Sequence, residues 1–207
     1  EGGGIRGLTV FLVDADTKGI SIGKEEDKMG IRASATAEII FEDCFVPDSA
    51  RVGKEGRGFM IAMQTLQMSR PVVAAISVGI AQAAIEAAVA YSHHRKQFGV
   101  KIATFEMVQQ MIADMVMKTE AARILTYKAC VAQMNKDKKA GLYSAMSKCF
   151  ASDTAMEVTT TAVQVMGGNG YSRENPVEKY MRDAKIMQIY EGTNQVQRLV
   201  IANEATF

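Results

Sequence analysis

The 207-residue sequence has few of the residues from which metal sites and disulfide frameworks are built. It contains two histidines, His93 and His94, and three cysteines, Cys44, Cys130 and Cys149. The histidines have no third ligand at metal spacing, and the cysteines are odd in number and widely spaced. We therefore expect no metal site and no disulfide, and reduced thiols in an intracellular, reducing compartment.

The sequence also lacks an excess of charge of one sign and a long apolar run. It has 24 Lys and Arg against 23 Asp and Glu, and its densest basic stretch is confined to residues 136–139. A nucleic-acid-binding protein would carry a basic patch, so we expect no nucleic-acid partner. Polar residues interrupt every apolar run before the ~18 residues of a membrane span, and no signal peptide opens the chain, so we expect no membrane span.

Residues 1–57 have the composition of strands and turns. The β-branched and aromatic runs 8–13 and 36–41 predict two strands, each bounded by turn residues. Two or three strands alone would be marginal in water. We therefore expect residues 1–57 to be part of a larger sheet domain.

From Gly58 onward the apolar residues recur with the period of a helix. A first helix should reach Tyr91 with a kink or short break at Pro71, and Thr104 should cap a second helix. A third helix is predicted over about residues 139–165.

A strong stop signal, Gly167-Gly168, follows the third helix, and Asn175-Pro176 should open a short fourth helix. The 48% of hydrophobic residues are ample for a packed core. The predicted fold class is α+β, mostly α: a partial β-sheet domain over residues 1–57, followed by an antiparallel four-helix bundle over residues 58–207.

Residues 189–198, IYEGTNQVQR, place one carboxylate between apolar residues and a helix start. Glu191 follows Ile189 and Tyr190, where burial disfavours the charged form of a carboxyl group, as in a catalytic base. Gly192 can adopt a backbone conformation closed to other residues, and Thr193 is a natural N-cap. Pattern alone favours a plain surface Glu in a helix cap over a catalytic base.

Two other stretches have equally ordinary interpretations by pattern alone. Residues 95–99, RKQFG, read as a cationic helix end in which Gly99 supplies a left-handed turn. Residues 164–171, QVMGGNGY, read as a helix C-cap followed by a glycine turn, without the preceding strand of a dinucleotide fingerprint.

These three stretches, taken together and in their order along the chain, resemble motifs of the acyl-CoA dehydrogenase family. Residues 190–198 are similar to the catalytic loop of its short- and medium-chain type, and residues 164–170 to its Gln-x-x-Gly-Gly-x-Gly signature. Residues 24–32 and 41–47 are similar to the second half of its middle β-domain. The resemblance covers essentially all of this chain but only the C-terminal half of a typical member.

The resemblance implies an FAD-dependent enzyme that desaturates acyl-CoA thioesters between the α and β carbons. Glu191 would be the catalytic base. The implied substrate-binding residues are Gln67, Arg70, Tyr190 and Gly192. The implied FAD-binding residues are Arg95, Gln97, Phe98, Gln164, Val165, Met166, Gly167, Gly168, Thr193, Asn194 and Gln195.

The resemblance further implies a homotetramer whose subunits share the FAD site, with electrons passed to an electron-transferring flavoprotein. The location would be the bacterial cytoplasm or the mitochondrial matrix. Two positions depart from the family pattern: Glu106 stands where many members have a Gln near FAD, and Gln67 where related members often have an acidic residue. Two functions are alternatives to an acyl-CoA dehydrogenase: an acyl-CoA oxidase and a non-catalytic helical assembly module.

Overall fold

The computed structural model describes residues 4–206, so the ends of the two predicted domains, residues 1–3 and 207, lie outside the described residues. The chain forms two compact units. One comprises the residues up to Lys28 together with Arg32–Leu66, and the other comprises Met29–Ile31 together with the chain from Gln67. The predicted division at 57/58 stays a prediction.

Short antiparallel strands make up the first unit. They are β1 (Val10–Phe11), β2 (Ile20–Glu25), β3 (Ala37–Phe41) and β4 (Arg51–Val52), with β1 paired to β4 and β2 paired to β3. The strand predicted at 36–41 is confirmed as β3, whereas the one predicted at 8–13 shrinks to the two residues of β1. Sequence reasoning missed β2. Gly23 and a register shift between Ile22 and Glu25 weaken the alternation of apolar and polar residues by which a strand is recognised.

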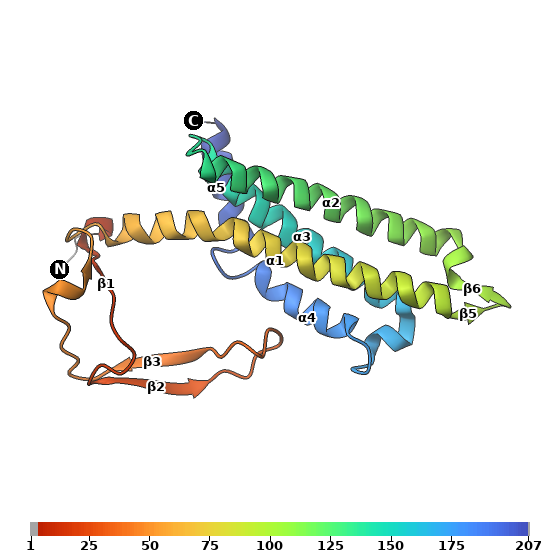
Figure 1. The fold of residues 1–207 in the computed structure, drawn as a ribbon, viewed down its shortest axis with the longest axis horizontal. Helices are drawn as coiled ribbons and strands as arrows, with labels where there is room; N and C mark the ends of the chain where they lie inside the picture. Colours follow the sequence, from red (N-terminus) through yellow and green to blue (C-terminus); the bar gives the residue numbers. More distant parts are fainter. Residues whose placement is uncertain (1–3, 207) are drawn as a thin grey trace. The chain divides into compact units, whose positions relative to one another are not determined.

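Five helices account for most of the second unit, although the start of α1, up to Leu66, belongs to the first. They are α1 (Gly58–His94), α2 (Glu106–Met134), α3 (Ala140–Met166), α4 (Val177–Met187) and α5 (Asn194–Thr206). In Figure 1, successive helices from α1 to α4 run in opposite directions. The predicted antiparallel four-helix bundle is confirmed, and α5 is an additional helix packed on α3.

The helix α3 lies at the centre of this unit. It packs against α2, α4 and α5, and its buried side chains join those of α1 in one core. Many of its buried residues are small, such as Ala151, Ala155 and Ala162, so neighbouring backbones can approach closely. The buried Thr159 hydroxyl donates back to the Ala155 carbonyl at 2.8 Å, which satisfies its polar group within the helix.

Pro71 does not break α1, contrary to one of the two predicted outcomes. A proline has no N–H, so the carbonyl four residues earlier, that of Gln67, loses its helical partner. The side-chain amide of Gln133 on α2 donates to this carbonyl at 3.0 Å and also to Ser144 Oγ on α3 at 2.8 Å. A tertiary hydrogen bond thus replaces the missing helical one.

Two predicted helix caps are wrong, and one helix stop is confirmed. The Thr104 hydroxyl donates to the Lys101 carbonyl at 2.7 Å, and α2 begins without a side-chain cap. Asn175 instead donates through its side chain to the Asn169 carbonyl at 2.8 Å, and Pro176 occupies the cap position of α4. The stop is confirmed, because α3 ends at Met166 and Gly167 has a φ of 58°.

The length and composition of α1 also suit a membrane span, although the polar residues in its apolar run led to the expectation of none. Isolated polar residues interrupt its apolar run without making the helix polar on average. Residues of α1 such as Ala81, Ala84 and Ile85 are buried in the core with residues of α2 and α3. A core helix of a bundle passes the same test of length and composition.

The contribution of the Gln133–Gln67 hydrogen bond to stability should depend on the presence of Pro71. Replacing Gln133 with Leu leaves the Gln67 carbonyl without a partner and should lower the free energy of unfolding by about 1–3 kcal/mol. In a Pro71→Ala background the restored N–H can serve that carbonyl, so the same replacement should cost less. Urea unfolding of the four proteins measures this coupling, and equal costs in the two backgrounds would contradict it.

Candidate active site

The loop between α4 and α5 holds Glu191 in an unusual backbone conformation. Glu191 has a φ of 59° and Gly192 a φ of 91°, so two successive residues are left-handed. The Thr193 hydroxyl accepts a hydrogen bond from the Val196 N–H at 3.4 Å, which confirms Thr193 as the cap of α5. A left-handed φ is ordinary for glycine but uncommon for glutamate, and such conformations persist where surrounding contacts enforce them.

The carboxylate of Glu191 is half-buried and faces α1. It accepts a hydrogen bond from the Ser69 hydroxyl. Its backbone carbonyl accepts one from Arg70 Nε at 3.4 Å and one from Gln197 Nε2 at 3.3 Å. Burial lowers the pKa of the Arg70 guanidinium, and the negative charges of Glu191 and Glu204 oppose this effect. The structure thus brings Glu191 and Arg70 together.

The next carbonyl, that of Gly192, also has two donors. Lys148 Nζ lies 2.8 Å from it and Gln197 Nε2 lies 3.1 Å from it. Lys148 comes from the first half of α3, is completely buried, and donates at 2.9 Å to the side-chain oxygen of Asn194. Burial lowers the pKa of Lys148 from 10.5 to about 8, because a low-dielectric environment disfavours the ammonium form.

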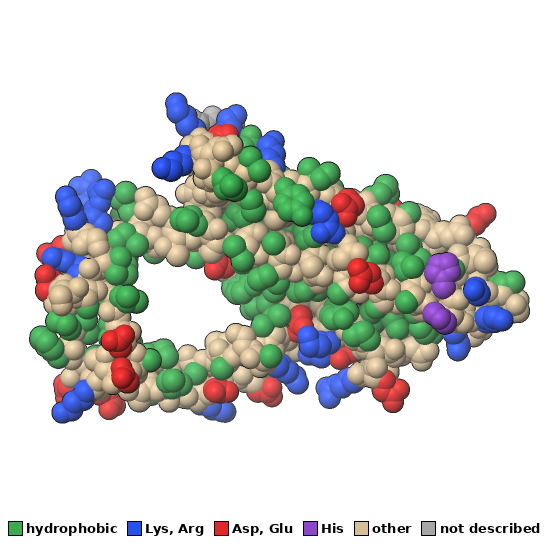
Figure 2. All heavy atoms as spheres, viewed as in Figure 1, with side chains coloured by type: hydrophobic (Ala, Val, Ile, Leu, Met, Phe, Trp, Pro, Cys, Tyr) green, Lys and Arg blue, Asp and Glu red, His purple; other side chains and the backbone are tan. Residues whose placement is uncertain are grey.

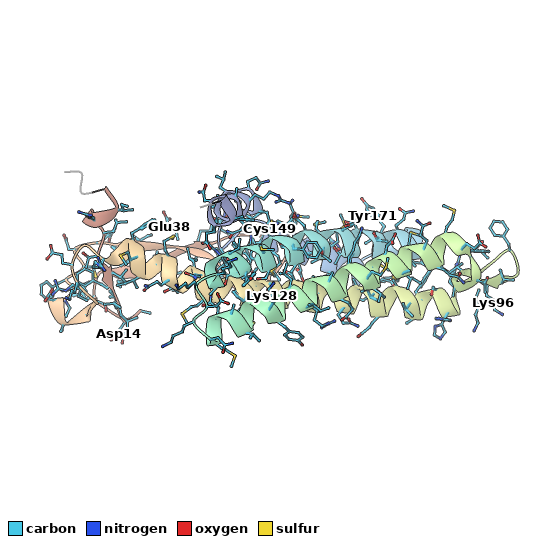
Figure 3. All side chains as sticks on the ribbon, turned by 90° about the horizontal axis from the view of Figure 1, so that it is seen from above. Asp14, Glu38, Lys96, Lys128, Cys149 and Tyr171 are labelled. Carbon is cyan, nitrogen blue, oxygen red and sulfur yellow. The ribbon has the colours of Figure 1, made fainter. Side chains whose placement is uncertain are left out.

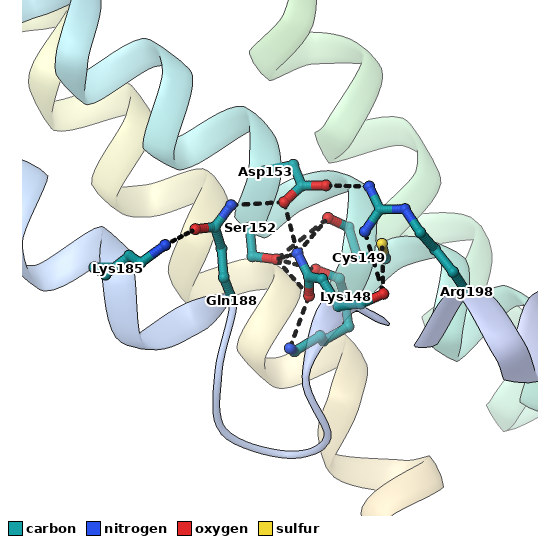
Figure 4. A network of polar contacts seen from close by, with 8 residues as sticks. Lys148, Cys149, Ser152, Asp153, Lys185, Gln188 and Arg198 are labelled. Carbon is teal, nitrogen blue, oxygen red and sulfur yellow. Dashed lines mark hydrogen bonds and ion pairs between the residues drawn. The ribbon is translucent and has the colours of Figure 1, made fainter. Parts of the chain in front are cut away.

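Asn194 is hydrogen-bonded to Lys148, Ser152 and Asp153 in a polar network, and Figure 4 labels these three partners. Asn194 is 3% exposed, and its amide nitrogen donates to Asp153 at 2.7 Å and to Ser152 at 2.8 Å. Burial pushes the pKa of the Asp153 carboxyl upward, but hydrogen bonds from Arg198, Gln188 and Asn194 outweigh it and leave that pKa below its usual value. The Asn194 side chain is therefore committed to the protein interior.

The other residues predicted around this loop are more open. Thr193 and Gln195 line a cavity of about 500 Å³ with residues of α3, α4 and α5. The Tyr190 hydroxyl contacts Met187 Sδ at 2.9 Å, and burial together with the charge of Glu191 raises the pKa of Tyr190. The Gln67 side chain lies against Gly141 at the start of α3.

A β-hairpin follows α1, where the sequence suggested only a helix end. Its strands are β5 (Lys96–Gln97) and β6 (Val100–Lys101). The two turn residues, Phe98 and Gly99, have φ values of 52° and 82°, as the tightest hairpin turns require. The left-handed turn predicted at Gly99 is confirmed. Phe98 gave no hairpin signal, because bulky residues rarely adopt a positive φ.

A cavity of about 350 Å³ lies where this end of α1 meets the end of α3. It brings together seven of the predicted FAD-binding residues: Arg95, Gln97, Gln164, Val165, Met166, Gly167 and Gly168. Tyr91 and Asn169 also line it and are hydrogen-bonded to each other at 2.7 Å. The Phe98 side chain is 93% exposed, with its ring edge-on to Phe105 at 6.3 Å.

Positive charge gathers at this end of the bundle. Figure 2 shows Lys and Arg side chains beside the two histidines, which end α1. No neighbouring atom of residues 4–206 lies within 4 Å of a Cβ built at Gly167 or Gly168, so their backbone is open to an approaching group. An exposed guanidinium and open glycine backbone are suited to an anion such as a diphosphate.

The two groups of predicted site residues lie far apart in one chain. Arg95 follows Arg70 by 25 residues along α1, which corresponds to about 37 Å at 1.5 Å per residue. Figure 3 shows Lys96, the residue after Arg95, at the hairpin end of the bundle and Cys149, the residue after Lys148, on the part of α3 near α5. The structure therefore joins Arg70 to Glu191 but leaves Arg95 at the other end of the bundle.

Sequence reasoning missed several residues that contact the loop of residues 191–194 or the Asn194 network: Ser69, Lys148, Asp153, Gln188, Gln197 and Arg198. One signal was available for Lys148. It falls on the buried stripe of α3, three residues from Ala145, four from Ser152 and seven from Ala155, so a lone lysine stands among small residues. Ser69 and Gln197 carried no comparable signal, because only tertiary packing brings them to Glu191.

Comparison with known proteins decides the family. Residues 56–206 match the model of the acyl-CoA dehydrogenase C-terminal domain. The chain belongs to the acyl-CoA dehydrogenase family. Acyl-CoA dehydrogenases are flavoprotein oxidoreductases that act on CH–CH bonds.

Three similar proteins illustrate the match. The mouse mitochondrial short-chain specific acyl-CoA dehydrogenase is 47% identical over 95% of this chain and 48% of its own length. Butyryl-CoA dehydrogenase from Megasphaera elsdenii superposes with a TM-score of 0.97 at 48% identity, over 99% of this chain and 53% of the other.

The third similar protein is a chain in the structure of the electron transferring flavoprotein of Acidaminococcus fermentans. It gives a TM-score of 0.96 at 53% identity, over 98% of this chain and 53% of that one. The present chain thus spans about half the length of the acyl-CoA dehydrogenases it matches.

The buried ammonium of Lys148 should make stability depend on pH. Between pH 8 and 10.5 the folded state has lost the Lys148 proton and the unfolded state still binds it, so stability rises with pH across this window. The rise attributable to Lys148 should approach about 3 kcal/mol and vanish as pH falls below 8. Urea unfolding at several pH values checks this, and Lys148→Met should remove the rise. Parallel pH profiles for the two proteins would contradict it.

Proposed function

We propose that the complete protein catalyses FAD-dependent α,β-desaturation of an acyl-CoA thioester, with Glu191 as the catalytic base. The observation that carries this proposal is the carboxylate of Glu191, presented on a left-handed loop whose two carbonyls are held by donors from three helices. Family membership supplies the reaction class, and this geometry supports the choice of base.

The proposed proton transfer uses residues around the loop. Glu191 would take the α-proton, and the Ser69 hydroxyl, which donates to the carboxylate, would orient it. The Glu191 backbone N–H and a ribityl hydroxyl of FAD would stabilise the negative charge that develops on the thioester oxygen. FAD, when bound, would accept the β-hydrogen as hydride. We assign Arg70, Tyr190 and Gly192 to the substrate side of this loop.

The cavity at the other end of the bundle suits part of FAD. The Arg95 guanidinium can bind the diphosphate in a bidentate way, and Gly167 and Gly168 leave their backbone open to it. We assign Gln97, Phe98 and Gln164 to the same FAD contact. Asn194 does not serve as a direct side-chain ligand in this proposal, because its amide is used inside the protein.

The separation of about 37 Å between the two groups supports a site shared between subunits. An isoalloxazine ring beside Glu191 and a diphosphate beside Arg95 of the same chain would be too far apart for one FAD molecule. We therefore propose that Arg95 and the glycines meet the FAD of a neighbouring subunit in a homotetramer. Thr193 and Gln195, which line the cavity near α5, would contact FAD at the same boundary.

An electron-transferring flavoprotein is the proposed electron acceptor. This assignment is supported by the similarity to a chain in the Acidaminococcus fermentans electron transferring flavoprotein structure. Bacterial and mitochondrial relatives support a location in the bacterial cytoplasm or the mitochondrial matrix. No observation on these helices favours the oxidase or the assembly module.

Glu191→Gln tests the proposed base. The amide keeps the size of the side chain and the Gly192 turn but cannot accept the α-proton. In a complete, flavin-loaded enzyme, flavin reduction by acyl-CoA should slow by at least ~100-fold while acyl-CoA still binds. Glu86→Gln, on the exposed face of α1, is the matched control and should keep the wild-type rate. Flavin bleaching at the wild-type rate in Glu191→Gln would exclude Glu191 as the base.

Arg95→Lys tests the proposed diphosphate contact. Lysine keeps the charge but loses the planar fork of the guanidinium, so FAD affinity should fall by about tenfold while the circular dichroism spectrum stays unchanged. Arg173→Lys, at an exposed position outside the cavity, is the control. Fluorescence titration of the apoenzyme with FAD measures both, and equal affinities would leave Arg95 with a helix-end role only.

A further inference from the structure

The loop that carries Glu191 is held through two consecutive backbone carbonyls. Arg70 from α1 and Gln197 from α5 donate to the carbonyl of Glu191, and Lys148 from α3 and Gln197 donate to that of Gly192. Each carbonyl orientation fixes one peptide plane, and the two planes flank Gly192. Three helices thus determine the direction in which the loop leaves Glu191.

These hydrogen bonds act where the backbone most needs support. Glu191 and Gly192 both have a left-handed φ, a conformation that a glutamate rarely adopts without enforcing contacts. Rotation of the Gly192–Thr193 peptide would remove the Gly192 carbonyl from Lys148 and Gln197 and would change ψ of Gly192 and φ of Thr193. Because Gln197 Nε2 donates to both carbonyls, this rotation would also disturb the Glu191–Gly192 peptide, whose plane sets ψ of Glu191. The donors to the Gly192 carbonyl therefore influence the orientation of the Glu191 carboxylate without contacting it.

Holding the loop with Lys148 lowers the stability of the fold, because it requires a buried positive charge. Its ammonium is completely buried in α3, and replacing a buried charged residue with an apolar one of similar shape is often neutral or stabilising. The charged or titratable groups that face it are Arg70 from α1, Glu191 from the loop, and Cys149 and Asp153 from α3 itself. No carboxylate pairs directly with Lys148 among the hydrogen bonds of the described residues; its two acceptors are a carbonyl and an amide oxygen.

We propose that Lys148 is a positioning residue for Glu191, holding the Gly192 carbonyl and the Asn194 side chain so that the carboxylate is presented in one orientation. This inference rests on the proposed function for its catalytic consequence, but not for its effect on the loop. Lys148 keeps the loop ordered and does so at a cost to the stability of the fold.

The variant Lys148→Met separates the two effects. Methionine has nearly the shape of the lysine stem, and no polar atom is left without a partner. The Gly192 carbonyl keeps Gln197, and the Asn194 oxygen lies 3.2 Å from the Ser152 hydroxyl, which can turn to it from the residue-148 carbonyl. That carbonyl still accepts the helical N–H of Ser152. Thr159→Val is the matched control, since Thr159 is equally buried on α3 and its hydroxyl serves only carbonyls of its own helix.

Amide hydrogen exchange in a complete, flavin-loaded enzyme measures the order of the loop. In Lys148→Met the amides of residues 191–193 should exchange at least ~10-fold faster, while amides in the centre of α2 keep their wild-type rates. The unfolding midpoint at pH 7 should be unchanged or higher. Thr159→Val should leave loop exchange at the wild-type rate. Wild-type loop exchange in Lys148→Met, or a variant that no longer folds, would overturn the proposal.

The catalytic consequence is measured on the same proteins. Flavin reduction in Lys148→Met should slow by about tenfold or more with acyl-CoA affinity within about threefold of wild type, because the base is misdirected while binding groups remain. A slowed rate with weakened affinity in equal measure would contradict a positioning role. If Glu191→Gln retains the wild-type rate, the proposed function fails, whereas faster loop exchange in Lys148→Met would still establish that Lys148 holds the loop.

Discussion

The hydrogen bonds of Lys148, Gln197 and Arg70 to two backbone carbonyls connect the bundle to its candidate active site. Each donor belongs to a different helix, so the position of the loop depends on how α1, α3 and α5 pack. Small residues on α3 allow that packing, because they bring its backbone close to its neighbours. The geometry at Glu191 is therefore a consequence of the whole core.

A second tertiary hydrogen bond has a similar role within α1. Pro71 removes one helical hydrogen bond, and the Gln133 side chain of α2 donates to the Gln67 carbonyl that is left without its helical partner. The helix continues, and Ser69 and Arg70 can point from it toward Glu191. Without such a partner, the proline would favour a break next to the residues that contact the loop.

Periodicity and stop signals allowed much of the fold to be predicted. The third helix, its end at Gly167, the cap at Thr193 and the left-handed Gly192 all depend on interactions within a few residues, which a sequence displays directly. The caps assigned to Thr104 and Asn175 were wrong because each side chain found another local carbonyl. Several alternatives of similar energy compete at such positions, and the sequence does not rank them.

The sequence by itself determined the helical bundle and, through its resemblance to a family, the residues Glu191, Arg95 and Gly167 as candidates. Only the tertiary structure decided that Lys148 and Gln197 reach the loop and that Asn194 points inward. It also decided that Glu191 contacts Arg70 and is therefore far from Arg95, which follows the opposite end of α1. Hydrophobic periodicity is a local property that can be read directly from the sequence. The partner of a buried polar group is instead chosen by which helices pack together, and this choice can join residues more than a hundred positions apart.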